Sequence, residues 1–191
     1  MSRRCNLEKS AILDQAMHFF WENGFDGASI DALVKAIGTS RFSLYQMFGG
    51  KDGLFLASLE HYSQVVVGQA LAILQAGTKG REGIANYFEH LIGAAQKADC
   101  LSRGCLMTNA MIEFGNQPSD IATSTQKHFQ RIVEAMAKAI GCSESTKYSK
   151  AEIANLALFI ATFAQGLWLR ARAGEDTKTL QKAYKTALLI L

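Results

Sequence analysis

The chain contains 191 residues, of which 49% are hydrophobic and 19% are charged, so it can form a substantial core and is neither disordered nor fibrous. Its formal net charge of +3 is too small to indicate a nucleic-acid-binding protein by itself. Four cysteines without a CxxC pair and four histidines without metal-binding spacing predict no disulfide framework, metal site or cofactor. No apolar leader is present and residues 154–169 are too short to span a membrane, so we expect a cytoplasmic protein with no membrane partner.

Apolar residues recur at helical spacing through almost the whole chain, and the single proline, Pro118, leaves room for long helices. Ser29 and Ser40 are good N-caps for two short helices, and Ser149-Lys150-Ala151-Glu152 fits a capping box. Pro118 suits the first turn of a helix. The sequence predicts an all-α protein of about nine helices, over residues 7–23, 30–36, 41–48, 51–75, 81–98, 104–114, 118–140, 150–173 and 177–191.

The second and third predicted helices are joined by Ile37-Gly38-Thr39, and a tight glycine-containing turn between two short helices is typical of a helix-turn-helix. Leu33 on the second helix and Leu44 on the third can face inward. The outward face of the third helix then carries a cation, amide and hydroxyl groups and aromatic rings, which are groups that can recognise DNA. These outward residues are Arg41, Phe42, Ser43, Tyr45 and Gln46.

Residues 38–54, with the sequence GTSRFSLYQMFGGKDGL, resemble the turn and recognition helix of the TetR family of bacterial transcriptional regulators. Upstream, Phe19-Phe20, Asn23-Gly24-Phe25 and Ala28-Ser29-Ile30 match the same family. The resemblance implies a helix-turn-helix DNA-binding domain at 1–50 and an effector-binding and dimerisation domain at 51–191. It also implies a homodimeric repressor, without catalytic residues, that binds a palindromic operator in double-stranded DNA and is released by a small-molecule effector.

Contacts with DNA can be assigned by position. Ser29 and Ser40 lie at helix N-termini, where backbone N–H groups favour phosphate, although both could act purely as caps. The resemblance makes Tyr45 and Lys51 phosphate contacts. Residues 1–60 hold six lysines and arginines against seven aspartates and glutamates, so binding cannot depend on a broad basic field. The candidates for reading bases are Arg41, Phe42, Ser43 and Gln46.

Two apolar stripes near the C-terminus predict a homodimer interface made by two helices of each protomer. Small residues on the first stripe would allow the helices to approach closely. The alternative is that one stripe covers the core of the monomer. The predicted interface residues are Ile153, Ala157, Ile160, Ala161, Ala164, Tyr184 and Leu188.

The family resemblance places an effector pocket inside the bundle, beside the helix that starts at Lys51. Methionine and aromatic side chains can repack around an apolar ligand, so we expect a mostly apolar, neutral or weakly anionic effector. The same residues at helical spacing could simply form the core. The candidate effector-binding residues are His61, Tyr62, Phe88, Met107, Asn109, Met111, Phe114, Phe163, Gln165 and Trp168.

Two other functions are compatible with parts of the sequence. A helical adaptor or scaffold protein without DNA binding would explain the bundle, with the polar residues of the third helix merely solvated. A redox- or electrophile-sensing regulator would use Cys105, because Arg103 is near enough to Cys100 and Cys105 to lower a thiol pKa. Packing as small hydrophobic residues is the plainer role for both cysteines.

Overall fold

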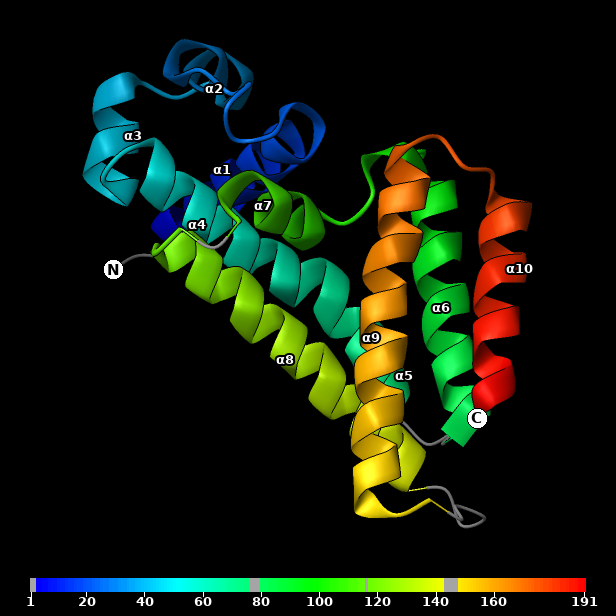
Figure 1. Cartoon of the computed structure of the whole chain (residues 1–191). Helices are drawn as coiled ribbons and strands as arrows, with labels where there is room; N and C mark the ends of the chain where they lie inside the picture. The colour runs from blue at the N-terminus through cyan, green and yellow to red at the C-terminus, as the bar shows by residue number, and fades with distance from the viewer. Residues whose placement is uncertain (1–2, 76–79, 116, 143–147) are drawn as a thin grey trace.

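The computed structural model describes residues 3–75, 80–115, 117–142 and 148–191, and the regular structure within these ranges is entirely helical (Figure 1), which confirms the all-α prediction. The elements in chain order are α1 (Arg3–Asn23), α2 (Ile30–Ile37), α3 (Arg41–Phe48), α4 (Lys51–Tyr62), a π-helical turn η1 (Ser63–Val67), α5 (Gly68–Gln75), α6 (Gly80–Lys97), a 3-10 turn η2 (Leu101–Arg103), α7 (Leu106–Phe114), α8 (Asp120–Gly141), α9 (Lys150–Arg172), α10 (Thr177–Ala187) and a 3-10 turn η3 (Leu188–Ile190).

The elements α4, η1 and α5 form one continuous rod. The backbone N–H of Ser63 still bonds to carbonyls of α4, and the N–H of Gly68 bonds to the carbonyl of Ser63, five residues earlier. This is the predicted helix 51–75, with a π-helical turn that the sequence did not indicate. With this rod counted once, the described residues contain nine helical rods, as predicted.

Three predicted helix starts are wrong, the first being that of α1, which begins at Arg3 and not at residue 7. Pro118 lies outside α8, because Ser119 is the N-cap and its Oγ accepts the N–H of Ala122 at 3.0 Å. The helix predicted from Gly104 begins at Leu106, because Gly104 has a left-handed φ of +65° that cannot continue an α-helix.

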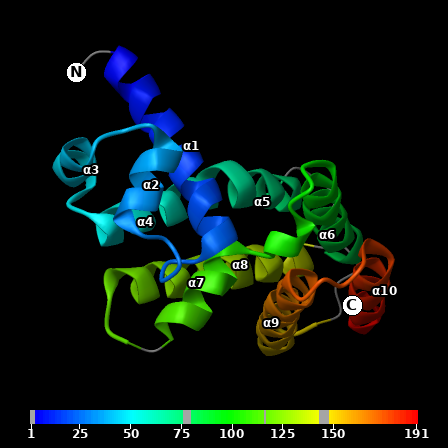
Figure 2. The same ribbon diagram turned by 90° about the horizontal axis from the view of Figure 1, so that it is seen from above.

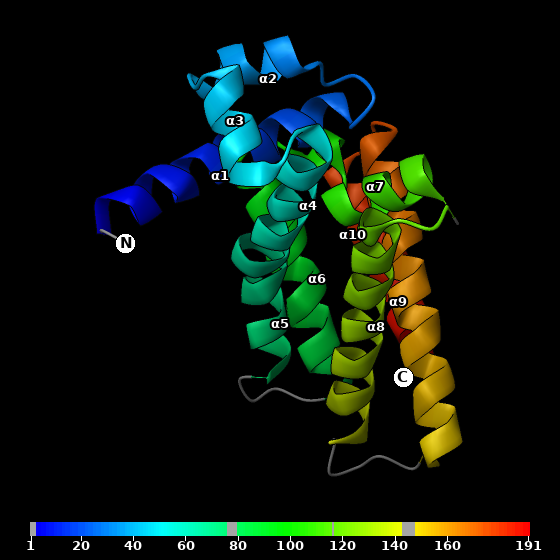
Figure 3. The ribbon, with the colours of Figure 1, turned by 90° about the vertical axis from the view of Figure 1, so that its left-hand side faces the viewer.

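The first three helices form a head at one end of the molecule (Figures 1 and 3). The rod α4–α5 runs from this head into a bundle in which α8 packs along α9, α5 along α6, and α10 against α6 and α9. Seen from above in Figure 2, α1 runs from the N-terminus toward the bundle, and it contacts α2, α4 and α7. The rod and α1 are therefore shared by the head and the bundle.

An aromatic cluster joins the head to the bundle. The ring of Phe55 on α4 lies 4.7 Å from that of Phe20 and 5.1 Å from that of Phe25, measured between centroids. Phe114 of α7 packs edge-on against Phe25 at 5.0 Å. The carboxylate of Glu113 on α7 accepts the backbone N–H of Phe25 at 2.7 Å. The loop before α2 is thus held by α7.

The inward faces of α9 and α10 belong to the monomer core, which contradicts the predicted dimer stripe. Ala157 and Ile160 are fully buried, and Tyr184 stacks on Phe88 with ring centroids 5.3 Å apart. These faces are covered by α6, α7 and α8 of the same chain, so they cannot meet a second protomer. The residues excluded from an interface are Ala157, Ile160, Ala161, Ala164, Tyr184 and Leu188, while Ile153 is half-buried against the same core.

The outward face of α9 is also apolar. Leu158, Phe159 and Leu169 are 49%, 50% and 47% exposed, and with the exposed Thr162 they form what we call the α9 stripe. Within the described residues, α9 is the one helix whose length of 23 residues and composition would allow it to cross a membrane. The sequence alone indicated an apolar stretch over residues 154–169, which is shorter than the helix that the structure shows. The α9 stripe is the part of this apolar surface that the chain leaves uncovered.

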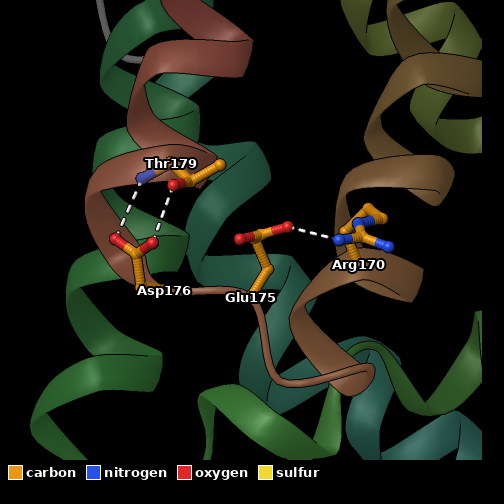
Figure 4. A network of polar contacts seen from close by, with 4 residues as sticks. All are labelled: Arg170, Glu175, Asp176 and Thr179. Atoms are coloured by element: carbon orange, nitrogen blue, oxygen red, sulfur yellow. Dashed lines mark hydrogen bonds and ion pairs between the residues drawn. The ribbon is translucent and has the colours of Figure 1, made fainter.

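A polar network fixes the turn between α9 and α10 (Figure 4). Arg170 forms an ion pair with Glu175, and Asp176 caps α10 by accepting the N–H and the hydroxyl of Thr179 at 3.1 and 2.7 Å. These hydrogen bonds lower the pKa of Asp176 below its usual value. The turn directs α10 back along α9 (Figure 1).

Candidate functional site

Side-chain caps fix both short helices of the head. Ser29 and Ser40 each accept a backbone N–H from the first turn of the helix that follows, at 3.2 and 3.0 Å. The helices α2 and α3 end at Gly38 and Gly49, whose left-handed φ values of +68° and +78° suit glycine. Both serines therefore act as structural caps, and each helix N-terminus lies where the sequence predicts.

One side of α3 packs inward and the other faces solvent. Leu44 is 1% exposed and packs with Leu33 in the core, whereas Phe42 is 75% and Tyr45 is 51% exposed. Met47 is 37% exposed and lies on the same side. Because it follows Ser43, a predicted outward residue, by four positions, the sequence could have identified Met47 as part of this face. The exposed face comprises Arg41, Phe42, Tyr45, Gln46 and Met47, with Ser43 half-buried beside Ser40.

Arg41 is held by an acidic neighbour. Its guanidinium lies 2.7 Å from the carboxylate of Asp31 on α2, and both side chains are largely exposed. An exposed ion pair of this kind is weak, so other groups can compete for Arg41 at little cost. These two residues are ten positions apart and on different helices, so no local pattern connects them.

Two lysines contact rings of the head. The Nζ of Lys51 lies 4.1 Å from the centroid of Phe25, and that of Lys9 lies 5.6 Å from the centroid of Phe48. Lys51 is the first residue of α4, whose N-cap, Gly50, makes no side-chain capping hydrogen bond. Lys9 was missed by the sequence analysis.

A cavity of about 330 Å³ lies between α1, the rod α4–α5, α6, α8 and α9. Three predicted effector residues line it: Tyr62 on the rod, and Gln165 and Trp168 on α9. The predicted placement beside the fourth helix is therefore matched by a cavity, although most of the predicted lining is not.

Several aromatic and polar candidates are used elsewhere. Phe88 is in the bundle core against Tyr184, with Phe163 at its edge, and Phe114 belongs to the aromatic cluster under the head. The Asn109 amide donates to the backbone carbonyl of Arg103 at 2.9 Å. None of these four candidates, Phe88, Asn109, Phe114 and Phe163, is among the described residues that line the cavity.

The other three candidates lie just behind or beside the cavity wall. His61 is 2.6 Å from Asp14, which does line the cavity. The sulfur of Met111 is 3.7 Å from the Gln165 amide nitrogen. Met107 lines a separate depression that borders α8. The helical pattern of the sequence could not show whether these side chains line the cavity or pack behind the residues that line it.

The wall also contains residues that the sequence analysis missed. Four wall residues lie on one face of α1, because Asp14 and Trp21 are each three or four positions from both Met17 and His18, so this shared face was a usable signal. The others come from separate helices, and a single sequence does not bring them together. They include Tyr87, His90, Cys100 and His128, and Cys105, previously considered as a possible sensor, lines the cavity too.

Burial raises the pKa of two tyrosine hydroxyls and of one thiol in this wall. It raises the pKa of Tyr62 well above its usual value, an effect that neighbouring Cys105 reinforces, and it raises the pKa of Tyr87. Burial also raises the pKa of Cys100 and outweighs the lowering effect of Arg103. For Cys100, the expected activation of a thiol by Arg103 is therefore wrong.

The segment around Gly104 connects the cavity with the head. The indole of Trp21 donates to the carbonyl of Gly104 at 3.1 Å. Arg172 donates to the carbonyls of Trp21 and Arg103 at 3.4 and 3.2 Å, and Arg103 lies 3.2 Å from His18. One cavity wall is thus bonded to α1, which supports the head.

His128 predicts a specific dependence of stability on pH. Burial, with a smaller effect of Arg131, lowers its pKa from 6.5 to about 4. Between these values the unfolded chain binds more protons than the folded chain, so stability falls as the pH is lowered. We expect a loss of about 2 kcal/mol at pH 5 relative to pH 7. His128→Phe should remove this part of the difference in urea unfolding, and an unchanged pH slope would contradict the assignment.

Comparisons with known proteins relate both halves of the chain to one group of regulators. Residues 12–58 match the model of bacterial regulatory proteins of the tetR family, and residues 80–187 match the model of the tetracyclin repressor-like C-terminal domain. The chain is similar to the HTH-type transcriptional repressor ComR of Escherichia coli (strain K12), with 29% identity over 186 residues that cover 95% of this chain and 88% of ComR.

Solved structures share the fold over nearly the whole length. A cysteine mutant of the transcriptional regulator CifR, complexed with 26bp double-strand operator DNA, has a TM-score of 0.79 and 25% identity and covers 94% of each chain. The regulatory protein TetR from Rhodobacter sphaeroides has a TM-score of 0.82 at 19% identity, covering 95% of this chain and 97% of that chain.

Proposed function

Because this chain belongs to the TetR family of DNA-binding transcriptional regulators, whose members are not enzymes, we propose that it is a cytoplasmic repressor that binds a palindromic operator as a homodimer and is released by a small-molecule effector. Residues 1–50 form its DNA-binding domain and residues 51–191 its effector and dimerisation domain. The observation that carries the proposal is the solvent-exposed face of α3, with Phe42 75% exposed on an otherwise well-packed head. The reading as an adaptor without DNA binding does not fit the family.

In the proposed complex, α3 enters the major groove and its exposed face reads bases. Tyr45 and Lys51 contact phosphate on either side of the Gly49-Gly50 turn. The N-termini of α2 and α3 add backbone N–H groups beside Ser29 and Ser40. The base-reading residues are Arg41, Phe42, Ser43 and Gln46. Arg41 leaves Asp31 when it reaches DNA, which is feasible because their ion pair is exposed.

Substitutions at Lys51 and Arg41 should have different effects on operator binding. Lys51→Ala should weaken binding to all sequences alike and reduce the slope of log affinity against log salt by about one, because a phosphate contact carries no sequence information. Arg41→Ala should relax the preference at one base pair, worth about 1–3 kcal/mol. Gel shifts on the flanking promoter at several salt concentrations, and selection of bound DNA, measure both effects.

Asp31→Asn is the matched control for Arg41→Ala. It breaks the Arg41 ion pair without removing the guanidinium, so the preferred base should stay the same.

Two recognition helices related by a two-fold axis reach major grooves about 34–36 Å apart, which requires an inverted repeat. Selected sites without inverted symmetry would count against the dimer.

In place of the predicted dimer interface, we propose that the α9 stripe forms the contact between two protomers. Its exposed leucines and phenylalanine lie on one side of a long helix, and the opposite side is already packed in the bundle. Large exposed apolar surfaces on a soluble protein mark contact sites. Pairing of α9 with α9 of a second protomer would cover the stripe and bring two heads to one operator.

Release by an effector requires that the ligand prefer the state that does not bind DNA, because equal affinity for both states shifts nothing. The cavity is suited to this, since Trp21 and Tyr62 in its wall lie on the two elements that continue to the head. A ligand that displaces α1 or the rod α4–α5 would change the position of α3 in both protomers.

A second candidate signal is a reactive compound that modifies a thiol. Cys105 supports it, because this cysteine lines the cavity next to Tyr62 and is 7% exposed. In this version the same cavity admits an electrophilic alkene. The Cys105 thiol adds across the double bond, so that sulfur bonds to one carbon and the thiol proton ends on the other, and this covalent product replaces the reversible complex. The neighbouring Cys100 is less suited to this role, because burial raises its pKa and outweighs the lowering effect of Arg103.

A further inference from the structure

The cavity wall is almost free of charge. Aromatic and aliphatic side chains make up most of it, and Asp14 is the one aspartate, glutamate, lysine or arginine among the described residues that line it. Asp14 is already paired with His61 at 2.6 Å. A charged ligand would lose its hydration in this cavity without meeting a free opposite charge, which is costly. The wall therefore favours an uncharged ligand.

Two of the three histidines of the wall, His18 and His128, do not change this conclusion. His18 lies 3.2 Å from Arg103, so its polar edge already has a neighbour. Burial lowers the pKa of His128 to about 4, which leaves its ring neutral at pH 7. The Nδ1 of His128 is buried and makes no hydrogen bond within the described part of the chain. The ring of His128 therefore supplies no charged centre for an anion.

Gln165 is a half-buried polar group of the wall that keeps unused hydrogen-bonding capacity. Its amide nitrogen contacts the thioether of Met111 at 3.7 Å, and sulfur is a weak acceptor. Its amide oxygen accepts no hydrogen bond from the described residues, although the side chain is half-buried. A carboxamide can donate to a carbonyl or accept from a hydroxyl, so it can pair with either group on a ligand.

Resting on the effector role proposed above, we propose that the cavity takes a compact, uncharged and largely apolar molecule whose hydroxyl or carbonyl group is hydrogen-bonded by Gln165. The volume of about 330 Å³ is at the small end of ligand pockets, which sets the size of a compound with one or two rings. Trp168, one helical turn further along α9, and Tyr62 on the rod supply flat apolar surface beside the carboxamide.

Three matched probes test the class of ligand. 4-tert-Butylphenol carries a hydroxyl, tert-butylbenzene lacks it, and 4-tert-butylbenzoate replaces it by a charge. Both tryptophans of the chain line the cavity, so tryptophan fluorescence reports its occupancy, with calorimetry as the second measurement. We expect the phenol to bind about tenfold more tightly than the hydrocarbon and the benzoate to bind most weakly. Tightest binding of the benzoate, or no binding of the phenol, would overturn the proposal.

Gln165→Met tests the residue, since methionine keeps the length of the side chain and removes the amide. The preference for phenol over hydrocarbon should fall from about tenfold to about onefold, with hydrocarbon binding unchanged. Met111→Leu is the control, because it removes the sulfur that Gln165 contacts and should leave the preference intact. Gln165→Leu repeats the test if the methionine variant does not fold. An unchanged preference in a folded Gln165 variant would refute the assignment of this residue.

The binding measurements are made on the protein without DNA, so they do not depend on operator release. Gel shifts with 4-tert-butylphenol then measure release separately. Binding in the expected order without release would leave the ligand assignment standing and contradict the effector role. Release of DNA without the Gln165-dependent preference would support the effector role and contradict the ligand assignment.

Discussion

Replacement of Leu158 and Phe159 by glutamate is expected to separate the proposed dimer into folded monomers and to weaken operator binding by at least about a hundredfold. Both side chains are half-exposed in the monomer, so the charges cost little until a second protomer covers them. Two unpaired charges buried at each side of the interface would then cost several kcal/mol. Sedimentation should show the monomer, and gel shifts with the selected operator should show the loss of binding.

Two other substitutions separate this result from misfolding. Gln126→Glu adds a charge to the exposed side of α8 and should leave the dimer intact. Ala161→Glu places the charge in the monomer core, where Ala161 is 1% exposed, and should unfold the chain. An intact dimer of the Leu158/Phe159 variant would move the interface to another surface.

Phe55→Ala should be the most destabilising single truncation at the junction of the head and the bundle, lowering the free energy of unfolding by about 3–5 kcal/mol and the Tm by about 10 °C. Phe55 is 1% exposed and contacts aromatic rings from α1, the loop before α2 and α7. Its removal leaves a cavity between the head and the bundle, which calorimetry and urea unfolding would measure.

Phe42→Ala is the control for this truncation. It removes an equally large ring from α3, but Phe42 is 75% exposed, so stability should change by less than about 0.5 kcal/mol. Equal losses in the two variants would mean that the cluster around Phe55 is not a packed core.

The head could be predicted closely because its determinants are local. Ser29 and Ser40 cap their helices through N–H groups three residues later, and Gly38 and Gly49 supply the left-handed ends. Each of these features is visible in a few consecutive residues. The buried position of Leu44 then determines which side chains of α3 face solvent.

The interface that we propose on α9 could not be predicted from the sequence, because α9 is apolar on both sides. Ala157 and Ala161 face inward, where neighbouring helices approach closely, whereas the bulkier Leu158 and Phe159 remain outside. A helical pattern shows that two apolar faces exist, and it does not show which one the rest of the chain covers. The small residues fitted the core, not the contact between protomers.

The cavity was predicted in place but not in composition for a similar reason. Tyr62, Gln165 and Trp168 reach it, while Phe114 belongs to a cluster under the head. Which side of a helix meets a cavity depends on how several helices cross, and these crossings involve residues far apart in the chain. His128 had no local feature that would have identified it.

The π-helical turn Ser63–Val67 has a consequence for comparing this chain with other regulators. A wider turn accommodates one additional residue, and each residue of an α-helix advances about 100° around the axis. Everything from Gly68 to Gln75 is consequently rotated relative to a helix that continues regularly from α4. Where a homologue has no such turn, an ungapped alignment pairs side chains that point in different directions. Ligand contacts on the second half of this rod are therefore better transferred by spatial superposition than by sequence position.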